Sequence, residues 1–205
     1  MCHADFVQQP RVVFRPAFGR ILTIVVVALL LTAVGGFVYT ADVSGAVHFG
    51  PLLTFVGYGT WLLYWRPAVI VDSTHLIVVN VGRTWAIPFT CLTAVETRYA
   101  LAVTTTAGKV TAWAAPAPGR HQTLSLSLAD FRSLRKGRQQ ESVRPGDAPN
   151  TESGSVAFVV RRRWQDALEN PSAGPAAQVT TRWHAVSLAV TAVLLVLTVL
   201  GIATA

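Results

Sequence analysis

Basic side chains are the residues of this chain whose types and spacing point most directly to a chemistry, the binding of anions. Arg132, Arg135, Lys136 and Arg138 lie close together, and an unbroken run, Arg161–Arg163, follows nearer the C-terminus. Such clusters contact the headgroups of anionic lipids, where each basic residue near the surface contributes about 1 kcal/mol. They also occur as solvated faces that only fix the orientation of a membrane protein. Both interpretations stay open, with Arg132, Arg135, Lys136, Arg138, Arg161, Arg162 and Arg163 as the candidate contact residues for lipid or partner.

The residue types that support catalysis or metal binding form no recognisable arrangement. None of the 5 His has a partner at helical i, i+4 spacing or an acid at metal-ligand spacing, and Cys2 and Cys91 are too far apart for a metal or redox motif. No nucleophile elbow, phosphate-binding loop or dinucleotide fingerprint is present. The basic residues lack the interleaved aromatics of a nucleic-acid surface. We therefore expect a non-enzymatic protein without metal, cofactor or nucleic-acid partner, and a buried Cys91.

The composition indicates a membrane protein. Hydrophobic residues make up 52% of the 205 residues and charged residues 13%, against about 25% charged in soluble domains. Ile21–Thr40 and Trp183–Ala205 lack formal charge and are long enough for a helix to cross a hydrocarbon core of about 30 Å. Basic residues before Ile21 also fit a signal peptide. The apolar run exceeds the roughly 7–15 residues of a signal core, however, and we predict a retained anchor.

A third apolar run, Phe49–Trp65, is shorter and ends in a cluster of aromatic residues of the kind found at membrane interfaces. Its length is near the lower limit for a spanning helix, so a re-entrant segment is the alternative. The basic residues favour a crossing, because segment 1–20 and the stretch Arg66–Arg182 carry Arg and Lys whereas Asp42–His48 carries neither. We therefore predict a multi-pass protein of the cell membrane with its head, residues 1–20, in the cytoplasm and its C-terminus outside.

Between the second and third spans, Pro67–Pro116 has the composition of short strands separated by turns. Val, Ile, Thr and Trp dominate, and Gly or polar residues separate the runs. The expected strands are Ala68–Asp72, Leu76–Asn80, Thr84–Pro88, Ala94–Thr97, Ala100–Thr106 and Lys109–Ala115. One run of strands followed by a helix predicts an antiparallel sheet or partly closed barrel covered by that helix. Trp85 and Trp113 fit core or sheet-face positions in it.

The covering helix is predicted at Ser155–Leu168. Its apolar residues recur at helical spacing and form one stripe, made of Val156, Val159, Val160, Trp164, Ala167 and Leu168. Arg161–Arg163 lie between stripe positions, so at least two of them should face solvent. Segment 117–154, rich in Pro, Gly and Ser, predicts a flexible insert, and segment 171–182 predicts a linker to the last span, 183–205.

The successive segments RPAVIVD, HLIVVN, TWAIPFTCLTAVE and a hairpin ending KVTAWAAP resemble the bacterial pleckstrin-homology (PH)-like domain of small membrane proteins, of the low-molecular-weight protein antigen type. The resemblance implies an α+β membrane protein: a transmembrane hairpin, 21–66, then a PH-like sheet closed by a helix, 67–170, and here a third transmembrane helix. It implies no catalytic activity. Lipid-binding members of the PH fold carry basic residues in a long first hairpin loop, which the short Ser73–His75 turn lacks.

These observations predict a membrane-anchored, non-enzymatic adaptor. Its PH-like domain would lie at the inner face of the membrane and bind another membrane or cytoplasmic protein. The alternative is a membrane-surface sensor that binds anionic lipids through the candidate basic residues. The two functions differ in their salt dependence, because lipid contact weakens as ionic strength rises through physiological values, where the screening length is about 8 Å.

Overall fold

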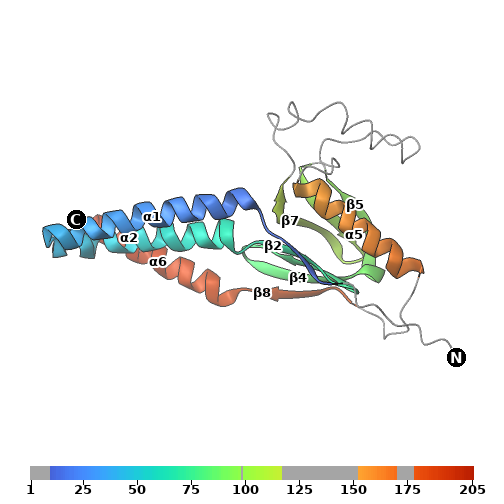
Figure 1. Ribbon diagram of the computed structural model, residues 1–205. Coiled ribbons are helices and arrows are strands. Elements are labelled where there is room, and N and C mark those ends of the chain that lie inside the picture. Colours follow the sequence, from blue (N-terminus) through green and yellow to red (C-terminus); the bar gives the residue numbers. More distant parts are fainter. Residues whose placement is uncertain (1–9, 98, 117–151, 170–177) are drawn as a thin grey trace. The chain divides into compact units, whose positions relative to one another are not determined.

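The computed structural model describes residues 10–97, 99–116, 152–169 and 178–205. They form an α+β protein with antiparallel strands, which divides into two compact units (Figure 1). We call the first the sheet unit; it comprises Met1–Arg15, Ala68–Asn80 and Thr84–Arg182. We call the second the helical unit; it comprises Pro16–Pro67, Val81–Arg83 and Trp183–Ala205.

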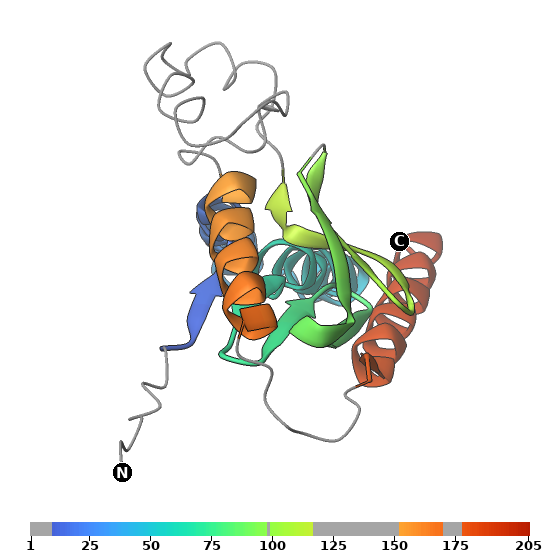
Figure 2. The ribbon, with the colours of Figure 1, turned by 90° about the vertical axis from the view of Figure 1, so that its right-hand side faces the viewer.

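The strands form two sheets, rather than one continuous sheet or barrel. The first has five strands in the order β1-β2-β3-β4-β8, and the second has three in the order β5-β6-β7. Strands of both sheets are seen in green and yellow-green in Figure 2. Their bounds are β1 Val12–Phe14, β2 Ala68–Val71, β3 His75–Val79, β4 Arg83–Pro88, β5 Leu92–Glu96, β6 Ala100–Thr105, β7 Gly108–Pro116 and β8 Thr180–Trp183. A short 3-10 turn, η2 (Phe89–Cys91), joins β4 to β5. Each strand predicted between Pro67 and Pro116 is confirmed to within two residues.

Both sheets contribute to one apolar core. Alternate side chains of β2 and β3 enter it, among them Val69, Leu76 and Val78, all fully buried. Cys91 is buried beside this core, as predicted. The helix α5 (Glu152–Glu169) packs on β5, β6 and β7. The predicted helix and its apolar face are therefore confirmed.

Two details of α5 differ from the prediction. The helix begins at Glu152, so residues 152–154, expected to close the flexible insert, form its first turn. The rest of that insert, 117–151, lies outside the described residues. Val156 and Val160 are buried, but Leu168 at the end of the stripe is 62% exposed because it lies in the last turn.

Two strands come from segments in which no strand was expected. β1 lies in the predicted head and pairs with β2, with Val12 opposite Val71 and Phe14 opposite Val69. β8 begins in the predicted linker and adds to the sheet beside β4. Both strands are too short to show alternation, and their formation depends on the free edges of β2 and β4. The head and the linker therefore contribute to the sheet.

The helical unit contains α1 (Ala17–Thr40), α2 (Val43–Thr60), the π-helix η1 (Trp61–Trp65) and α6 (Ala185–Ala203). α1 and α2 form a hairpin whose turn places Ala41 at a φ of 52°, in the left-handed region. Asp42 caps α2, since its Oδ1 accepts a hydrogen bond of 2.8 Å from the Gly45 N–H. The hairpin predicted from the sequence is thus present as a helical structure.

Within the described part of the chain, α1 and α6 are long and apolar enough to cross a membrane, with 24 and 19 residues. The predicted span 49–65 does not meet the same measure of length and composition. Its helix α2 includes His48, Pro51 and several glycines and gives way to the π-helix after Thr60. The described residues therefore contain 2 helices that are long and apolar enough to cross a membrane, one fewer than predicted.

The core of the sheet unit should respond to loss of Leu76 but not of the exposed Leu168. In a Cys2→Ser background, we expect Leu76→Ala to lower the free energy of opening by about 2–5 kcal/mol, because it leaves a cavity. The rate at which a thiol reagent modifies the buried Cys91 measures this opening and should rise by a factor of about 30 or more. The matched change Leu168→Ala should alter the rate less than about two-fold. Equal rates for the two variants would contradict the described core.

Candidate functional site

The basic residues predicted to contact lipid or a partner are not gathered on one surface of the described structure. Arg132, Arg135, Lys136 and Arg138 lie outside the described residues. Arg163 is buried, at 8% exposure, and its Nη2 donates to the Pro10 carbonyl at 2.9 Å. Arg161 is half-buried and donates through Nη2 to the Val95 carbonyl at 3.1 Å. At least two of the three arginines were expected to face solvent, whereas Arg162 alone is exposed.

A second candidate surface lies on β7, around Trp113. Its outward positions are Lys109, Thr111 and Trp113, and the side chain of Trp113 is 58% exposed. Asn80, just after β3, holds this strand with both ends of its amide. Its Nδ2 donates to the Thr111 carbonyl at 2.8 Å, and its Oδ1 accepts from the Trp113 N–H at 3.1 Å. The exposed indole therefore stands on a fixed backbone.

The same face of the three-stranded sheet carries an ion pair. Lys109 Nζ lies 2.6 Å from Glu96 Oε2, and both side chains are about half exposed. Thr111 is paired across the sheet with Ala102, which lies next to Glu96 on β5. We call the outward residues Glu96, Lys109, Thr111 and Trp113 the β7 surface. It combines one large aromatic side chain with polar neighbours.

In the helical unit, the start of α1 touches the π-helix backbone directly. A Cβ placed on the buried Gly19 would lie 2.6 Å from the Tyr64 carbonyl oxygen, so no larger residue fits without movement. This approach sets the next residue, Arg20, over the Trp65 ring, with 5.8 Å between its Cζ and the ring centroid. Such a contact between a guanidinium and an indole is a cation–π interaction.

Arg66 follows the π-helix and joins three segments of the helical unit. Its Nη1 donates to Ser187 Oγ of α6 at 3.0 Å and to the Val81 carbonyl at 3.4 Å. In the same region, the His184 N–H donates to the Gly82 carbonyl at 2.9 Å. The turn between β3 and β4 is thus hydrogen-bonded to the start of α6.

α6 runs antiparallel to α2. Near its start, Ser187 accepts a hydrogen bond of 3.4 Å from Tyr58 Oη, late in α2. Near its end, Gly201 is so close to the His48 carbonyl that a Cβ there would overlap it. The last helix therefore packs on α2 of the hairpin. Ala203, at the end of α6, therefore lies at the same end of the helical unit as the α1–α2 turn.

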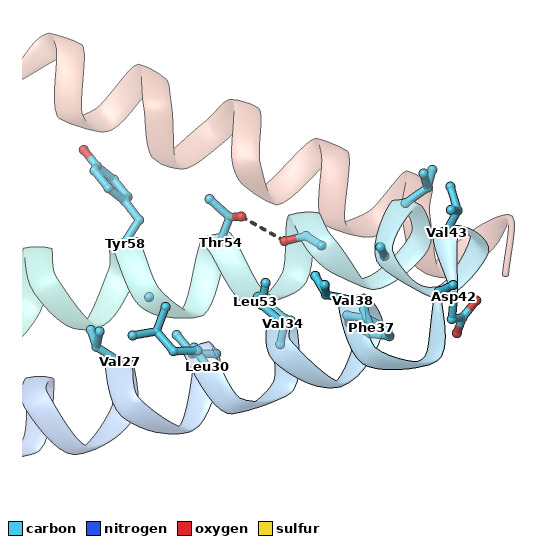
Figure 3. Close-up of a pocket in the computed structure, with 16 residues that line it drawn as sticks. Val27, Leu30, Val34, Phe37, Val38, Asp42, Val43, Leu53, Thr54 and Tyr58 are labelled. Carbon is cyan, nitrogen blue, oxygen red and sulfur yellow. Dashed lines mark hydrogen bonds between the residues drawn. The ribbon is translucent and has the colours of Figure 1, made fainter.

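A groove of about 740 Å³ lies between α1 and α2, from the hairpin turn to Tyr58 (Figure 3). Its volume is within the roughly 300–1,000 Å³ of ligand pockets, and its lining is mostly apolar. The polar groups that would orient a ligand are engaged: Thr54 donates to the Gly50 carbonyl, Asp42 caps α2 and Tyr58 donates to Ser187. We therefore assign no ligand to this groove.

Comparisons of the chain with family models, with curated proteins and with solved structures found no match. The assignment of function therefore depends on the surfaces described above. Among the described residues, no group of three or more His, Cys, Asp and Glu side chains is placed to hold a metal ion.

Sequence reasoning missed the residues that form these surfaces. Asn80 appears in the sequence only as the last residue of a strand, and Gly19 only as part of a head. The adjacent residues Trp65 and Arg66 did give a signal, because an aromatic residue and an arginine end an apolar run. That signal was used for membrane topology alone, since the contact partners lie far away in the sequence.

The backbone contact between α2 and α6 should be sensitive to a single methyl group at position 201. We expect Gly201→Ala to destabilise the helical unit by about 1–3 kcal/mol, because the added Cβ overlaps the His48 carbonyl. Gly36→Ala in α1 is the matched control, since no atom lies within 4 Å of its Cβ position. It should be neutral or stabilising by up to about 1 kcal/mol. Thermal unfolding of the purified protein in detergent measures both, and a similar response of the two variants would contradict the described packing.

Proposed function

We propose that this protein is a membrane-anchored, non-enzymatic adaptor that binds another protein through the β7 surface. The observation that carries the proposal is the exposed Trp113, held on a fixed backbone by Asn80. Tryptophan is among the residues that contribute most at protein interfaces. Because Asn80 restrains the strand, binding there would cost little backbone ordering.

The anchor of this adaptor would be the helical unit. α1 and α6 have the length and composition of spans. α2 and η1 together run from Val43 to Trp65, close to the 24 residues of α1. This arm follows α1 over its length, with contacts from Gly57 to Leu30 and from Tyr64 to Gly19. If α1 crosses the membrane, this arm therefore returns through it, which supports a third crossing at 49–65.

The charges of the helical unit support its orientation. Its basic residues are Arg20, Arg66 and Arg83, which lie near the start of α1, the end of η1 and the start of α6. Its one acid, Asp42, lies at the hairpin turn. By the positive-inside rule the arginine end is cytoplasmic. The sheet unit then lies in the cytoplasm of a multi-pass cell-membrane protein, and the C-terminus lies outside.

We also propose that the sheet unit is a PH-like domain. Two antiparallel sheets followed by a helix that packs its apolar face on them are consistent with that architecture. β1 and β8 would be additions from the flanking segments. The PH-like proposal concerns the fold of the sheet unit and adds no activity to the adaptor.

The alternative, a sensor of anionic lipids that uses the predicted basic clusters, has less support on α5. Arg161 and Arg163 donate to backbone carbonyls of the sheet unit, which leaves Arg162 as the exposed member of the run. An arginine that already holds the fold together gains less from a lipid phosphate than a free one, because it must first leave its partner.

Topology can be tested with single cysteines in a Cys2→Ser background, since Cys91 is buried. We expect Ser44→Cys at the hairpin turn and Thr204→Cys after α6 both to react with a membrane-impermeant thiol reagent added to intact cells. Arg162→Cys should react only after permeabilisation. Labelling of Arg162→Cys in intact cells, or of positions 44 and 204 from opposite sides, would refute the proposed topology.

The adaptor role can be tested by photo-crosslinking in the native host. We expect a photoreactive residue in place of Thr111 to give a discrete protein adduct. Trp113→Ala should reduce its yield by about ten-fold or more, as loss of an interface hot spot does. Phe158→Ala is the matched control, because Phe158 is similarly exposed, at 63%, but lies on α5. Adducts with lipid alone, or a protein adduct insensitive to Trp113→Ala, would contradict the adaptor proposal.

A further inference from the structure

We propose that Arg20 and Arg66 bind phosphate groups of anionic phospholipid at the arginine end of the helical unit. This inference concerns residues outside both predicted basic clusters. It rests on the membrane placement of the helical unit in the proposed function, and it is independent of the adaptor role of the sheet unit.

Arg20 contacts Trp65 where the start of α1 meets the π-helix. The close contact of Gly19 with the Tyr64 carbonyl holds the first turn of α1 against the π-helix. Arg20 is thereby stacked on the Trp65 ring, and Arg66 is the next residue along the chain. The two arginines, 46 residues apart in the sequence, therefore lie at the same end of the helical unit, Arg20 on the Trp65 ring and Arg66 directly after Trp65 in the chain. π-Helical turns are rare and occur frequently at functional sites.

Neither Arg20 nor Arg66 has a carboxylate partner among the described residues. Arg66 uses Nη1 for two neutral acceptors, Ser187 Oγ and the Val81 carbonyl. Arg20 has its contact with Trp65. A guanidinium presents five N–H donors in a planar fork that matches phosphate oxygens in pairs. The groups left over on Arg20 and Arg66 therefore suit a phosphate.

The charged residues of the helical unit favour an anion at the arginine end. The helical unit has a single acid, Asp42, and this residue lies at the opposite end, beyond the length of α1. No acid of the helical unit therefore lies near Arg20 and Arg66, which favours an anion from outside the unit.

The exposed apolar side chains that follow Arg20 indicate that the anion is a lipid. Beyond Arg20, α1 continues with apolar side chains that are open to the surroundings, Ile21 at 62% and Ile24 at 60% exposure. Trp61 and Tyr64 of the π-helix are each 40% exposed, and such residues favour the headgroup level of a bilayer. A ligand that satisfies both features has a phosphate joined to long hydrocarbon chains. An anionic phospholipid has this chemistry.

The experiment uses the purified full chain in mixed micelles with equal amounts of phosphatidylglycerol and phosphatidylcholine. Native mass spectrometry gives the ratio of the two lipids that remain bound. We expect phosphatidylglycerol to be enriched, with each arginine contributing a factor of about five. Arg20→Gln should lower the enrichment by about that factor. Arg20→Gln/Arg66→Gln should bring the ratio close to that of the micelle.

The matched control is Arg11→Gln, which removes the same charge as Arg20→Gln from an exposed position of the sheet unit and should leave the ratio unchanged. Arg20→Gln is informative even if loss of Arg66 impairs folding, because Arg20 makes no hydrogen bond within the described structure and is exposed. An unchanged ratio in Arg20→Gln would overturn the proposal. A drop of equal size in the control would do so as well, because it would reveal a general charge effect.

Inorganic phosphate distinguishes a lipid site from a site for any small anion. Addition of inorganic phosphate at millimolar concentration should leave bound phosphatidylglycerol in place, since the hydrocarbon chains contribute to its retention. Complete displacement would assign the site to free phosphate and overturn the lipid identity. Labelling of Ser44→Cys and Thr204→Cys reports the membrane placement separately, so a failure of the placement and a failure of the lipid site can be told apart.

Discussion

Direct contact between helix backbones is the interaction on which the helical unit depends. Gly19 against the Tyr64 carbonyl and Gly201 against the His48 carbonyl bring the helices closer than side chains would allow. In hydrocarbon no hydrophobic force drives helices together, so such close packing is a principal source of association. The same contacts place Arg20 over Trp65 and Ser187 within reach of Arg66. The positions of Arg20 and Arg66 at the arginine end of the helical unit thus depend on glycine at positions 19 and 201.

The sheet unit was largely predictable from the sequence because its strands are coded locally. Six strands between Pro67 and Pro116 show β-rich runs with turn residues between them, and α5 shows a clear helical stripe. β1 and β8 were not predictable, since three or four residues carry no periodic signal and their pairing is decided by the edges of β2 and β4. One helix fewer than predicted is apolar enough to span. The helix over the third apolar run begins at Val43, includes His48 and Pro51, and changes to a π-helix after Thr60.

The candidate sites were less predictable than the fold. Helical spacing placed Arg163 on the flank of the stripe, but it did not show that the flank is covered by the segment before β1, whose Pro10 carbonyl accepts its hydrogen bond. Asn80 and Trp113 are likewise brought together by the meeting of β3 with β7. Each of these contacts joins residues distant in sequence, and residue type alone gives no information on such pairs.

The placement of the arginines bears on the choice between an adaptor and a lipid sensor. On α5, Arg161 and Arg163 hold the sheet unit together through backbone carbonyls, and their charge is committed to the fold. In the helical unit, Arg20 and Arg66 stack on an indole or bond neutral oxygens, and they keep donors for an external anion. Lipid recognition and protein recognition can therefore reside in different units of one chain. On this view the headgroup contact belongs to the anchor, and the β7 surface is left for a protein partner.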